Sequence, residues 1–455
     1  MRKTWWWISM VGVATTVALG VAGYALWSFQ DEPAPWTTRS PKALEAFDEG
    51  IWNLSRFYFR DAVVQFERAL ELDPDFPMAR LHLALLHEEG DPERDRLMEG
   101  LATVNAEGMT EMERWLLTYW LTRHGGDVEG ARTFLVGYLE GRPDDAYARF
   151  TLCGDRWMAQ DWDAADACYR KLIEMHPNWV LAQSRLGYIA MARGRFDEAE
   201  EHFLTYRYIA PDQAAPYGSL GQLLTIRGRY DEARDSLGEA LAQKGDYCEA
   251  HVSRVRLSLM AADFDGADQA IDQLEGTPGC GFLVERGYVC DLRAWRAYLA
   301  GRTGEARKRV AVCRQDRSFA SLLIHRMAAM GGDLAAAEAE EALAAEALAS
   351  TDETDPAALL NEAILLHLQG VRTMVLGDWG KAAELLESAD RLNNYWGLER
   401  AIFKLFNRLN LIYCLERAGR DGEAEALREQ VEAVNPRYLE DYRLPDLEAL
   451  AGGGW

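Results

Sequence analysis

Five alanines in the middle of this chain follow one another at intervals of 34 residues. They are Ala131, Ala165, Ala199, Ala233 and Ala267. They close five similar motifs, GDVEGA, QDWDAA, GRFDEA, GRYDEA and ADFDGA. Sequences that repeat every 20 to 50 residues or so form stacks in which each unit packs on its neighbours. The 455 residues are therefore expected to form a stack of similar units instead of a few unrelated domains.

The residues around each alanine predict two helices joined by a short turn. Glycine and an acidic residue before the alanine favour the end of one helix and the capped start of the next, as at Asp197 and Asp231. Alanine allows the two helices to approach closely, and an aromatic ring such as Phe203 follows four residues later. Proline ends the second helix because it has no amide hydrogen to donate. These prolines are Pro74, Pro143, Pro177, Pro211 and Pro436.

This pattern resembles the tetratricopeptide repeat family, whose unit has 34 residues, a small residue early in its second helix and a proline at its end. The resemblance implies an all-α fold, a right-handed α-solenoid of about ten or eleven helix pairs. A solenoid is expected over residues 42–350, with units near 43–76, 77–111, 112–145, 146–179, 180–213, 214–247, 248–281, 287–317 and 318–350. Further pairs are expected over 351–442, and a tail over 443–455. A loop is expected at Gly276–Gly281, and a break between two halves at the acidic stretch 350–356.

An uncharged segment near the start predicts one transmembrane helix. Residues 5–29 contain no acid or base, and about 20 apolar residues cross a bilayer. Basic residues precede the segment and acidic residues follow it, which places residues 1–4 in the cytoplasm and the rest of the chain outside it. Residues 30–41 are expected to be a linker. The expected interfacial anchors are Trp5, Trp6, Trp7, Tyr24 and Trp27.

A cleaved signal peptide is the alternative for this segment. Gly23 and Ala25 are small residues of the kind found before a cleavage site. The apolar run is longer than the core of a signal peptide, however, and continues through Leu26 and Trp27. The uncleaved anchor, in the inner membrane with most of the chain in the periplasm or outside, is preferred. Cleavage would give a secreted protein.

The charge of the chain limits its partners. There are 73 acidic and 49 basic residues, a net charge of −24. Such a surface repels phosphate backbones, so nucleic acid is not expected as a partner. Partners with basic segments are favoured, and their weak binding should be sensitive to salt.

The sequence contains no recognisable catalytic or metal-binding motif. No two of the eight histidines have the i, i+4 spacing of a helical metal pair. GDWGK at 377–381 lacks the full phosphate-loop pattern, and GSLG at 218–221 lacks the spacing of a nucleophile elbow. No catalytic residue, metal or cofactor is predicted, and the chain is not expected to be an enzyme.

Seven cysteines in a chain placed outside the cytoplasm predict one or two disulfides. Cys153 and Cys168 fall in one helix pair, and Cys280, Cys290 and Cys313 lie close together in the sequence. A bridge between the first two, or within the group of three, is expected. The alternative is that most cysteines are small buried side chains.

The resemblance also implies where a partner would bind. In this family the first helices of the pairs line a concave groove that holds peptides or protein segments. The side chains at groove positions here are Trp120, Arg123, Tyr147, Phe150, Trp157, Met158, Tyr188 and Met191. The alternative is that these side chains are buried between neighbouring units. The basic clamp that some family members use for C-terminal carboxylates is absent from these units, where Phe150, Ser184, Gly218 and Gln222 stand instead.

These observations favour a membrane-anchored, extracytoplasmic scaffold or adaptor that assembles or stabilises a complex of envelope proteins. The partners are expected to be proteins or peptide segments of basic character. Two other functions stay open, a sensory ectodomain that binds a ligand and a non-catalytic subunit of a membrane enzyme.

Overall fold

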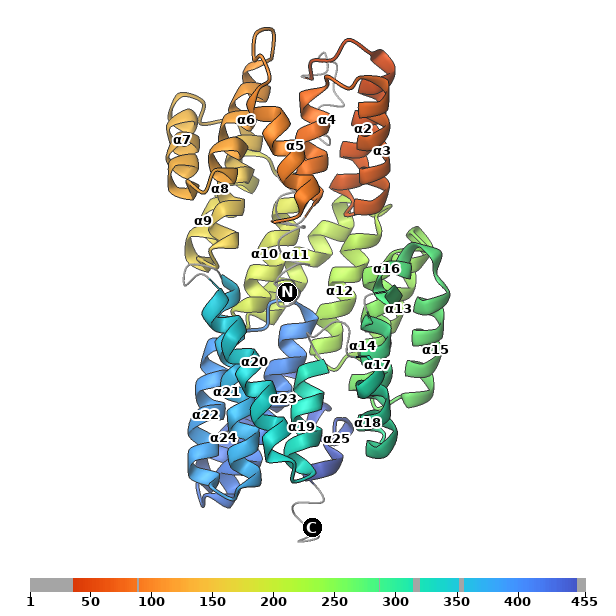
Figure 1. The fold of residues 1–455 in the computed structure, drawn as a ribbon, viewed down its shortest axis with the longest axis vertical. Helices are drawn as coiled ribbons and strands as arrows, with labels where there is room; N and C mark the ends of the chain where they lie inside the picture. The colour runs from red at the N-terminus through yellow and green to blue at the C-terminus, as the bar shows by residue number, and fades with distance from the viewer. Residues whose placement is uncertain (1–35, 88–89, 286, 314–319, 352–355, 448–455) are drawn as a thin grey trace. The chain divides into compact units, whose positions relative to one another are not determined.

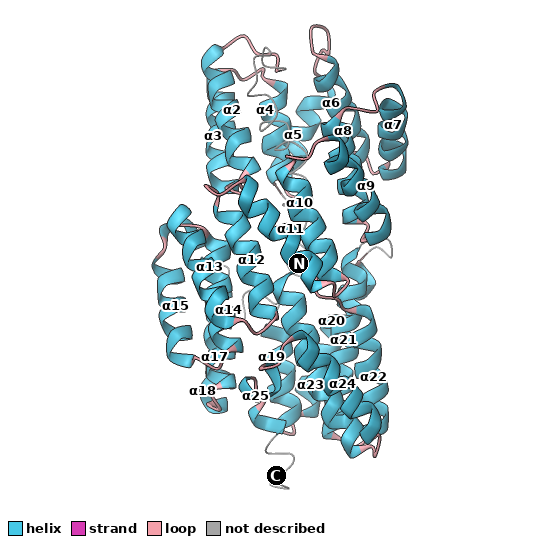
Figure 2. Cartoon of the chain, turned by 180° about the vertical axis from the view of Figure 1, so that it is seen from behind, coloured by secondary structure: helices cyan, strands magenta, loops and turns pink. Residues whose placement is uncertain are grey.

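The computed structural model describes residues 36–87, 90–285, 287–313, 320–351 and 356–447, and every regular element in these ranges is helical (Figures 1 and 2). The helices of the first part are α2 (Pro41–Ser55), α3 (Phe59–Leu72), α4 (Pro77–Leu86), α5 (Pro92–Ala102), α6 (Glu111–His124), α7 (Val128–Gly141), α8 (Ala146–Met158), α9 (Trp162–Met175), α10 (Val180–Ala192) and α11 (Phe196–Ile209). Those of the second are α12 (Ala214–Ile226), α13 (Tyr230–Gln243), α14 (Cys248–Met260), α15 (Phe264–Gly276), η1 (Pro278–Cys280), α16 (Gly281–Glu285), α17 (Tyr288–Leu299), α18 (Thr303–Val312), α19 (Ala320–Met330), α20 (Leu334–Ser350), α21 (Pro356–Val375), α22 (Trp379–Leu392), α23 (Gly397–Arg417), α24 (Asp421–Val434) and α25 (Tyr438–Asp441).

Most of these helices form pairs, each with an A helix, a short turn and a B helix. The pairs are α2/α3, α4/α5, α6/α7, α8/α9, α10/α11, α12/α13, α14/α15, α17/α18, α19/α20, α21/α22 and α23/α24. The expected loop at Gly276–Gly281 instead contains the short helix η1 and the start of α16.

Caps and close contacts explain why the repeat residues form pairs. The side chain of Asp127 accepts a hydrogen bond from Gly130 at the start of α7, and Asp161 does the same for α9. The predicted cap at Asp231 is wrong, because α13 starts one residue earlier and Arg229 holds the cap position without a side-chain bond. Asp231 lies in the first turn, where a negative charge favours the helix dipole.

The small residues of the repeat lie where two helices of a pair touch. The five alanines that define the repeat are fully buried. A Cβ atom on Gly50 would lie 2.5 Å from the ring of Phe66, and one on Gly187 would collide with Phe203 in the same way. These positions of the A helices therefore require glycine, since the B-helix ring occupies the space of any side chain.

The chain divides into two compact units. The N-terminal unit comprises the described residues up to 186 together with 208–210, and the C-terminal unit comprises 187–207 and 211–447. The expected break at 350–356 is not where the units divide. Glu341 of α20 pairs with His325 of α19 at 3.1 Å and with Arg372 of α21 at 2.7 Å, so the helices on both sides of that stretch are tied together.

The described part of the expected linker packs on the N-terminal unit. Trp36 is buried against Phe47, with ring centroids 5.1 Å apart. The hydroxyl of Thr37 donates to the buried carboxylate of Glu113 at 2.7 Å. Residues 36–40 are therefore part of the folded unit and not a free stalk.

The predicted transmembrane segment, residues 5–29, lies outside the described residues, and so do its five aromatic anchors. In the described ranges, no helix combines the length and the apolar character needed to cross a membrane.

Candidate functional site

The aromatic side chains expected to line a groove in the N-terminal unit are core residues. Tyr147, Phe150 and Trp157 of α8 are at most 2% exposed, and Trp120 of α6 is 6% exposed. They pack on rings and cations of neighbouring helices: Tyr147 on Trp115, Phe150 on Tyr169 and Trp179, and Trp157 on Trp162 and Arg185. The groove interpretation is wrong for these four residues, because successive A helices lie close enough for large side chains to fill the space between them.

The remaining predicted groove residues are also held by neighbours. Arg123 donates to Asp155 of the next A helix at 2.9 Å. Tyr188 shares a hydrogen bond with Ser219 at 3.0 Å, and Met191 is fully buried, which contradicts a groove role for it. Only Met158, Arg123 and Tyr188 of the eight are partly exposed.

The described residues contain three disulfides. Cys153 is bonded to Cys168 and Cys290 to Cys313, with Cα atoms 5.4 and 5.6 Å apart, and both pairs join the A and B helices of one unit. The partner of Cys280 is Cys248, which the sequence had not singled out. Cys414 is a buried free thiol, and burial raises its pKa to about 12.

In the C-terminal unit the A helices are covered by a further helix of the same unit. α23 packs against α12, and its side chains reach three more A helices: Glu399 pairs with Arg256 of α14, Phe406 contacts Trp295 of α17, and Asn410 accepts from Arg326 of α19. The surface that would form a groove is thus occupied from within the unit. Residues on most faces of α23 are buried, including polar ones such as Lys404 and Asn410, which is consistent with its central position.

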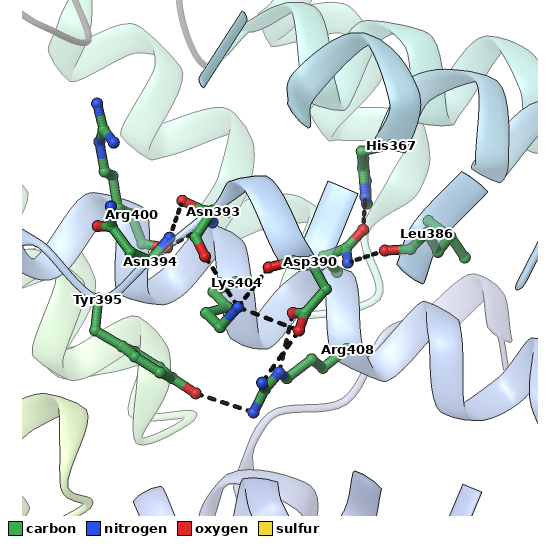
Figure 3. Close-up of polar contacts among 10 residues, drawn as sticks. His367, Leu386, Asp390, Asn393, Asn394, Tyr395, Arg400, Lys404 and Arg408 are labelled. Carbon is green, nitrogen blue, oxygen red and sulfur yellow. Dashed lines mark hydrogen bonds and ion pairs between the residues drawn. The ribbon is translucent and has the colours of Figure 1, made fainter. Parts of the chain in front are cut away.

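Buried charges hold α23 in place (Figure 3). Asp390 of α22 lies between Lys404 and Arg408 of α23, with ion pairs of 3.1 and 3.0 Å. Arg408 also donates to the hydroxyl of Tyr395 at 3.0 Å, and burial raises the pKa of that hydroxyl to about 12. His367 of α21 contacts Asn407 at 2.8 Å, and burial lowers its pKa to about 3, so it is neutral. These groups satisfy one another, and we assign them a structural role.

An apolar cavity lies between α14, α17, α19 and α23. Its volume is about 70 Å³, and its walls are Arg256, Leu259, Met260, Tyr288, Asp291, Leu292, Trp295, Leu299, Leu322, Glu399, Ile402, Phe403, Phe406 and Tyr442. Arg256 and Glu399 form an ion pair at one end, where the hydroxyl of Tyr288 donates to Glu399 at 3.3 Å. The buried indole nitrogen of Trp295 has no acceptor among the described residues.

The size of the cavity limits what it can hold. Sites for drug-sized ligands enclose roughly 300 to 1,000 Å³, and an empty apolar cavity of about 150 Å³ takes up benzene. A volume of about 70 Å³ therefore suits one aliphatic side chain better than a whole small molecule. A second hollow, of about 270 Å³, lies between α18 and α19, but it is more open and Arg307 already donates to the carbonyl of Met327 there.

The end of the described chain closes the cavity on one side. Tyr442 lines it, and Asp446 lies on the guanidinium of Arg326, with Nη2–Oδ1 and Nε–Oδ2 distances of 2.5 and 2.9 Å. The hydroxyl of Tyr298 donates to Asp446 at 2.6 Å, and Asn410 accepts from Arg326 at 2.7 Å. Residues 443–455 were expected to be a tail, and a single carboxylate after Leu444 and Pro445 gives no sequence pattern that predicts the role of Asp446. In the ranges that the structure describes, no group of three side chains is placed to hold a metal ion.

A family model described as the tetratricopeptide repeat matches residues 155–216, over the α8/α9 and α10/α11 pairs. Residues 155–216 of the chain therefore contain tetratricopeptide repeats. In the α2/α3 and α10/α11 pairs, a glycine of the A helix faces an aromatic ring of the B helix, as the repeat pattern implies. No curated protein matches the sequence.

The solved structures that resemble this chain do so distantly. A chain of the APC/C hetero-tetramer Cut9–Hcn1 is 13% identical to this chain. The match covers 87% of this chain and 74% of that chain, with a TM-score of 0.48. A tetratricopeptide repeat protein from Parabacteroides merdae is 12% identical, with coverages of 64% and 98% and a TM-score of 0.43. PilW, a type IV pilus biogenesis factor, is 16% identical, with coverages of 44% and 90% and a TM-score of 0.39. These values are too low to transfer any property of those proteins.

Proposed function

We propose that this chain is a non-catalytic scaffold that binds other proteins of the cell envelope and is anchored in a membrane by residues 5–29. The observation that carries the proposal is the set of stacked helix pairs, together with an apolar cavity whose volume suits one side chain of a partner. Stacked repeats present extended surfaces on which partner proteins bind.

The cavity is the proposed anchor point for a partner. Binding energy at protein interfaces concentrates in a few apolar or aromatic side chains that fill well-packed pockets. The walls contributed by Trp295, Phe403 and Phe406 offer such a pocket, and its small volume favours a side chain of a bound protein. A sensory ectodomain that holds a drug-sized ligand there is correspondingly less favoured.

The extracytoplasmic location is supported by two independent features. The uncharged segment 5–29 has the length of a membrane span, and three disulfides join cysteines of the repeats. Structural disulfides form and persist mainly in oxidising compartments. With a net charge of −24, the partners are proposed to carry basic segments, so that capture weakens as salt increases.

Capture of partners by the tagged full-length chain from mild-detergent membranes tests the binding function. Ile402 lines the cavity and is half-buried, so Ile402→Glu should remove a set of partners while the protein stays folded. Leu409, half-buried on the same helix but away from the cavity, provides the matched control as Leu409→Glu. Retention of all partners by the first variant would refute the cavity as the anchor point, and an empty capture with wild type would refute the scaffold.

Location is tested by alkylating thiols in intact cells before and after reduction. A membrane-impermeant maleimide should label the repeats only after reduction, because six of the seven cysteines are paired. Full labelling only after the cells are broken would place the repeats in the cytoplasm and contradict the proposal.

A further inference from the structure

The C-terminal segment, residues 442–447, occupies a site built for a carboxylate. Arg326 is 1% exposed, and Asp446 accepts from its Nη2 and Nε atoms. The hydroxyl of Tyr298 donates to the same carboxylate, and the amide oxygen of Asn410 accepts a hydrogen bond from Nη1 of Arg326. Two nitrogen donors and one hydroxyl thus converge on a single carboxylate, which is a geometry specific for that group.

The site cannot stand empty without a large loss of stability. A guanidinium buried without its counter-ion is strongly destabilising, because the protein interior does not replace the lost hydration. Any state in which Asp446 leaves therefore favours a replacement that is also a carboxylate. A neutral amide of the same shape would leave the charge of Arg326 uncompensated.

The two sides of this contact differ in how firmly they are held. Tyr298, Arg326 and Asn410 lie on α17, α19 and α23, and each of these helices packs on neighbouring helices, such as α18, α20 and α22. The backbone hydrogen bonds described for the C-terminal segment are local, from Tyr442 to Tyr438 and from Leu447 to Leu444. The segment is held mainly by the side chains of Tyr442, Leu444 and Asp446, so a ligand that replaces these side-chain contacts can release it.

The carboxylate site adjoins the apolar cavity. Tyr442 is part of the cavity wall, and Phe406 contacts both Trp295 of that wall and, at 5.3 Å, the guanidinium of Arg326. Departure of the C-terminal segment would widen the cavity and uncover the guanidinium at the same place. A ligand for the opened site therefore needs an apolar side chain and a carboxylate a few residues apart.

We propose that the C-terminal segment is an intramolecular ligand, and that a partner peptide carrying a carboxylate beside apolar side chains displaces it from the site formed by Arg326, Tyr298 and Asn410. The inference rests on the proposed scaffold function and names the partner chemistry at its cavity. The partner would then carry this one carboxylate within a sequence that is otherwise basic. The tethered segment competes at a high effective concentration, so the free chain is blocked against weak ligands.

The test measures binding of a fluorescent peptide, Tyr-Arg-Leu-Pro-Asp-Leu, to the full-length protein in detergent. The peptide has the sequence of the C-terminal segment, and a second peptide has Asn in place of Asp. Asp446→Asn weakens the tethered copy, and Glu440→Gln, an exposed carboxylate nearby, is the control. The Asp peptide should bind the Asp446→Asn protein about tenfold or more tightly than wild type or the control, and the Asn peptide should bind none of them.

Hydrogen exchange of the same proteins supplies the second readout. Asp446→Asn should speed exchange in residues 438–447 and leave α12–α15 protected. Equal peptide affinity for all three proteins, or unchanged exchange in 438–447, would overturn the proposal. Loss of protection throughout α17, α19 and α23 would also overturn it, because Asp446 would then be an indispensable part of the core. Peptide binding needs no natural partner, so failure here is separate from failure of partner capture.

Discussion

The two units are built from the same helix pairs but cover the inner faces of their A helices differently. In the N-terminal unit, large aromatic side chains such as Tyr147 and Trp157 fill the space between successive A helices. In the C-terminal unit the helix α23 covers the A helices instead. Ion pairs of Asp390 with Lys404 and Arg408 hold α23 in this position. The comparison teaches that the repeat determines the pair, whereas residues outside the repeat pattern determine what lies over the A helices.

Replacing Tyr147, Phe150 and Trp157 together by alanine should have the largest effect. Each loss of a buried Phe or Trp side chain costs about 3 to 5 kcal/mol, so the triple variant should unfold the N-terminal unit. Circular dichroism and hydrogen exchange should show α6–α9 unprotected and α12–α15 unchanged. Tyr208→Ala, at a ring that is 86% exposed, should have no such effect. A folded triple variant would mean that these rings are not core.

Asp390→Ala should destabilise the C-terminal unit by about 3 to 5 kcal/mol, because it leaves Lys404 and Arg408 buried without a counter-ion. Urea unfolding followed by exchange in α21–α24 measures the loss. The control is Glu111→Ala in the N-terminal unit, since Glu111 and Arg142 form an exposed pair whose loss costs at most about 1 kcal/mol. Equal losses of unfolding free energy in the two variants would mean that the Asp390 ion pairs stabilise the C-terminal unit no more than an exposed ion pair does. The proposed difference between the two units would then be wrong.

Replacing Cys153 and Cys168 together by serine should destabilise the N-terminal unit by about 3 kcal/mol, the value for a closed loop of about 15 residues. The same double change at Cys290 and Cys313 should weaken the C-terminal unit by a similar amount. Urea midpoints of the two units measure both. Unaltered midpoints would show that the pairs are not formed in the native protein.

Both units should lose some stability in mild acid. Burial lowers the pKa of His82 in the N-terminal unit to about 4 and that of His367 in the C-terminal unit to about 3, whereas an unfolded histidine has a pKa of about 6.5. The unfolded chain therefore binds protons first, so stability falls as pH decreases from 6.5 towards these values, by about 1.4 kcal/mol per histidine and pH unit. His82→Leu should flatten the pH dependence of the N-terminal unit alone, and an unchanged slope would contradict the assignment.

The pairs could be predicted from sequence because their spacing repeats and each position has a local physical reason. The burial of Phe150 and Trp157 could not, since the repeat positions say which way a side chain faces but not how closely the next A helix approaches. The roles of Asp390 and Asp446 were also out of reach. Each depends on residues far away in sequence, and one carboxylate among 73 acidic residues carries no pattern.

Hydrogen exchange of the full-length protein, alone and saturated with its captured partner, tests the account most directly. The account predicts that partner binding protects the cavity walls on α14, α17 and α23 and at the same time speeds exchange in residues 438–447, because the C-terminal segment is displaced. Protection of 438–447 that stays unchanged or increases in the complex would contradict it, because the partner would then bind without replacing Asp446 on Arg326.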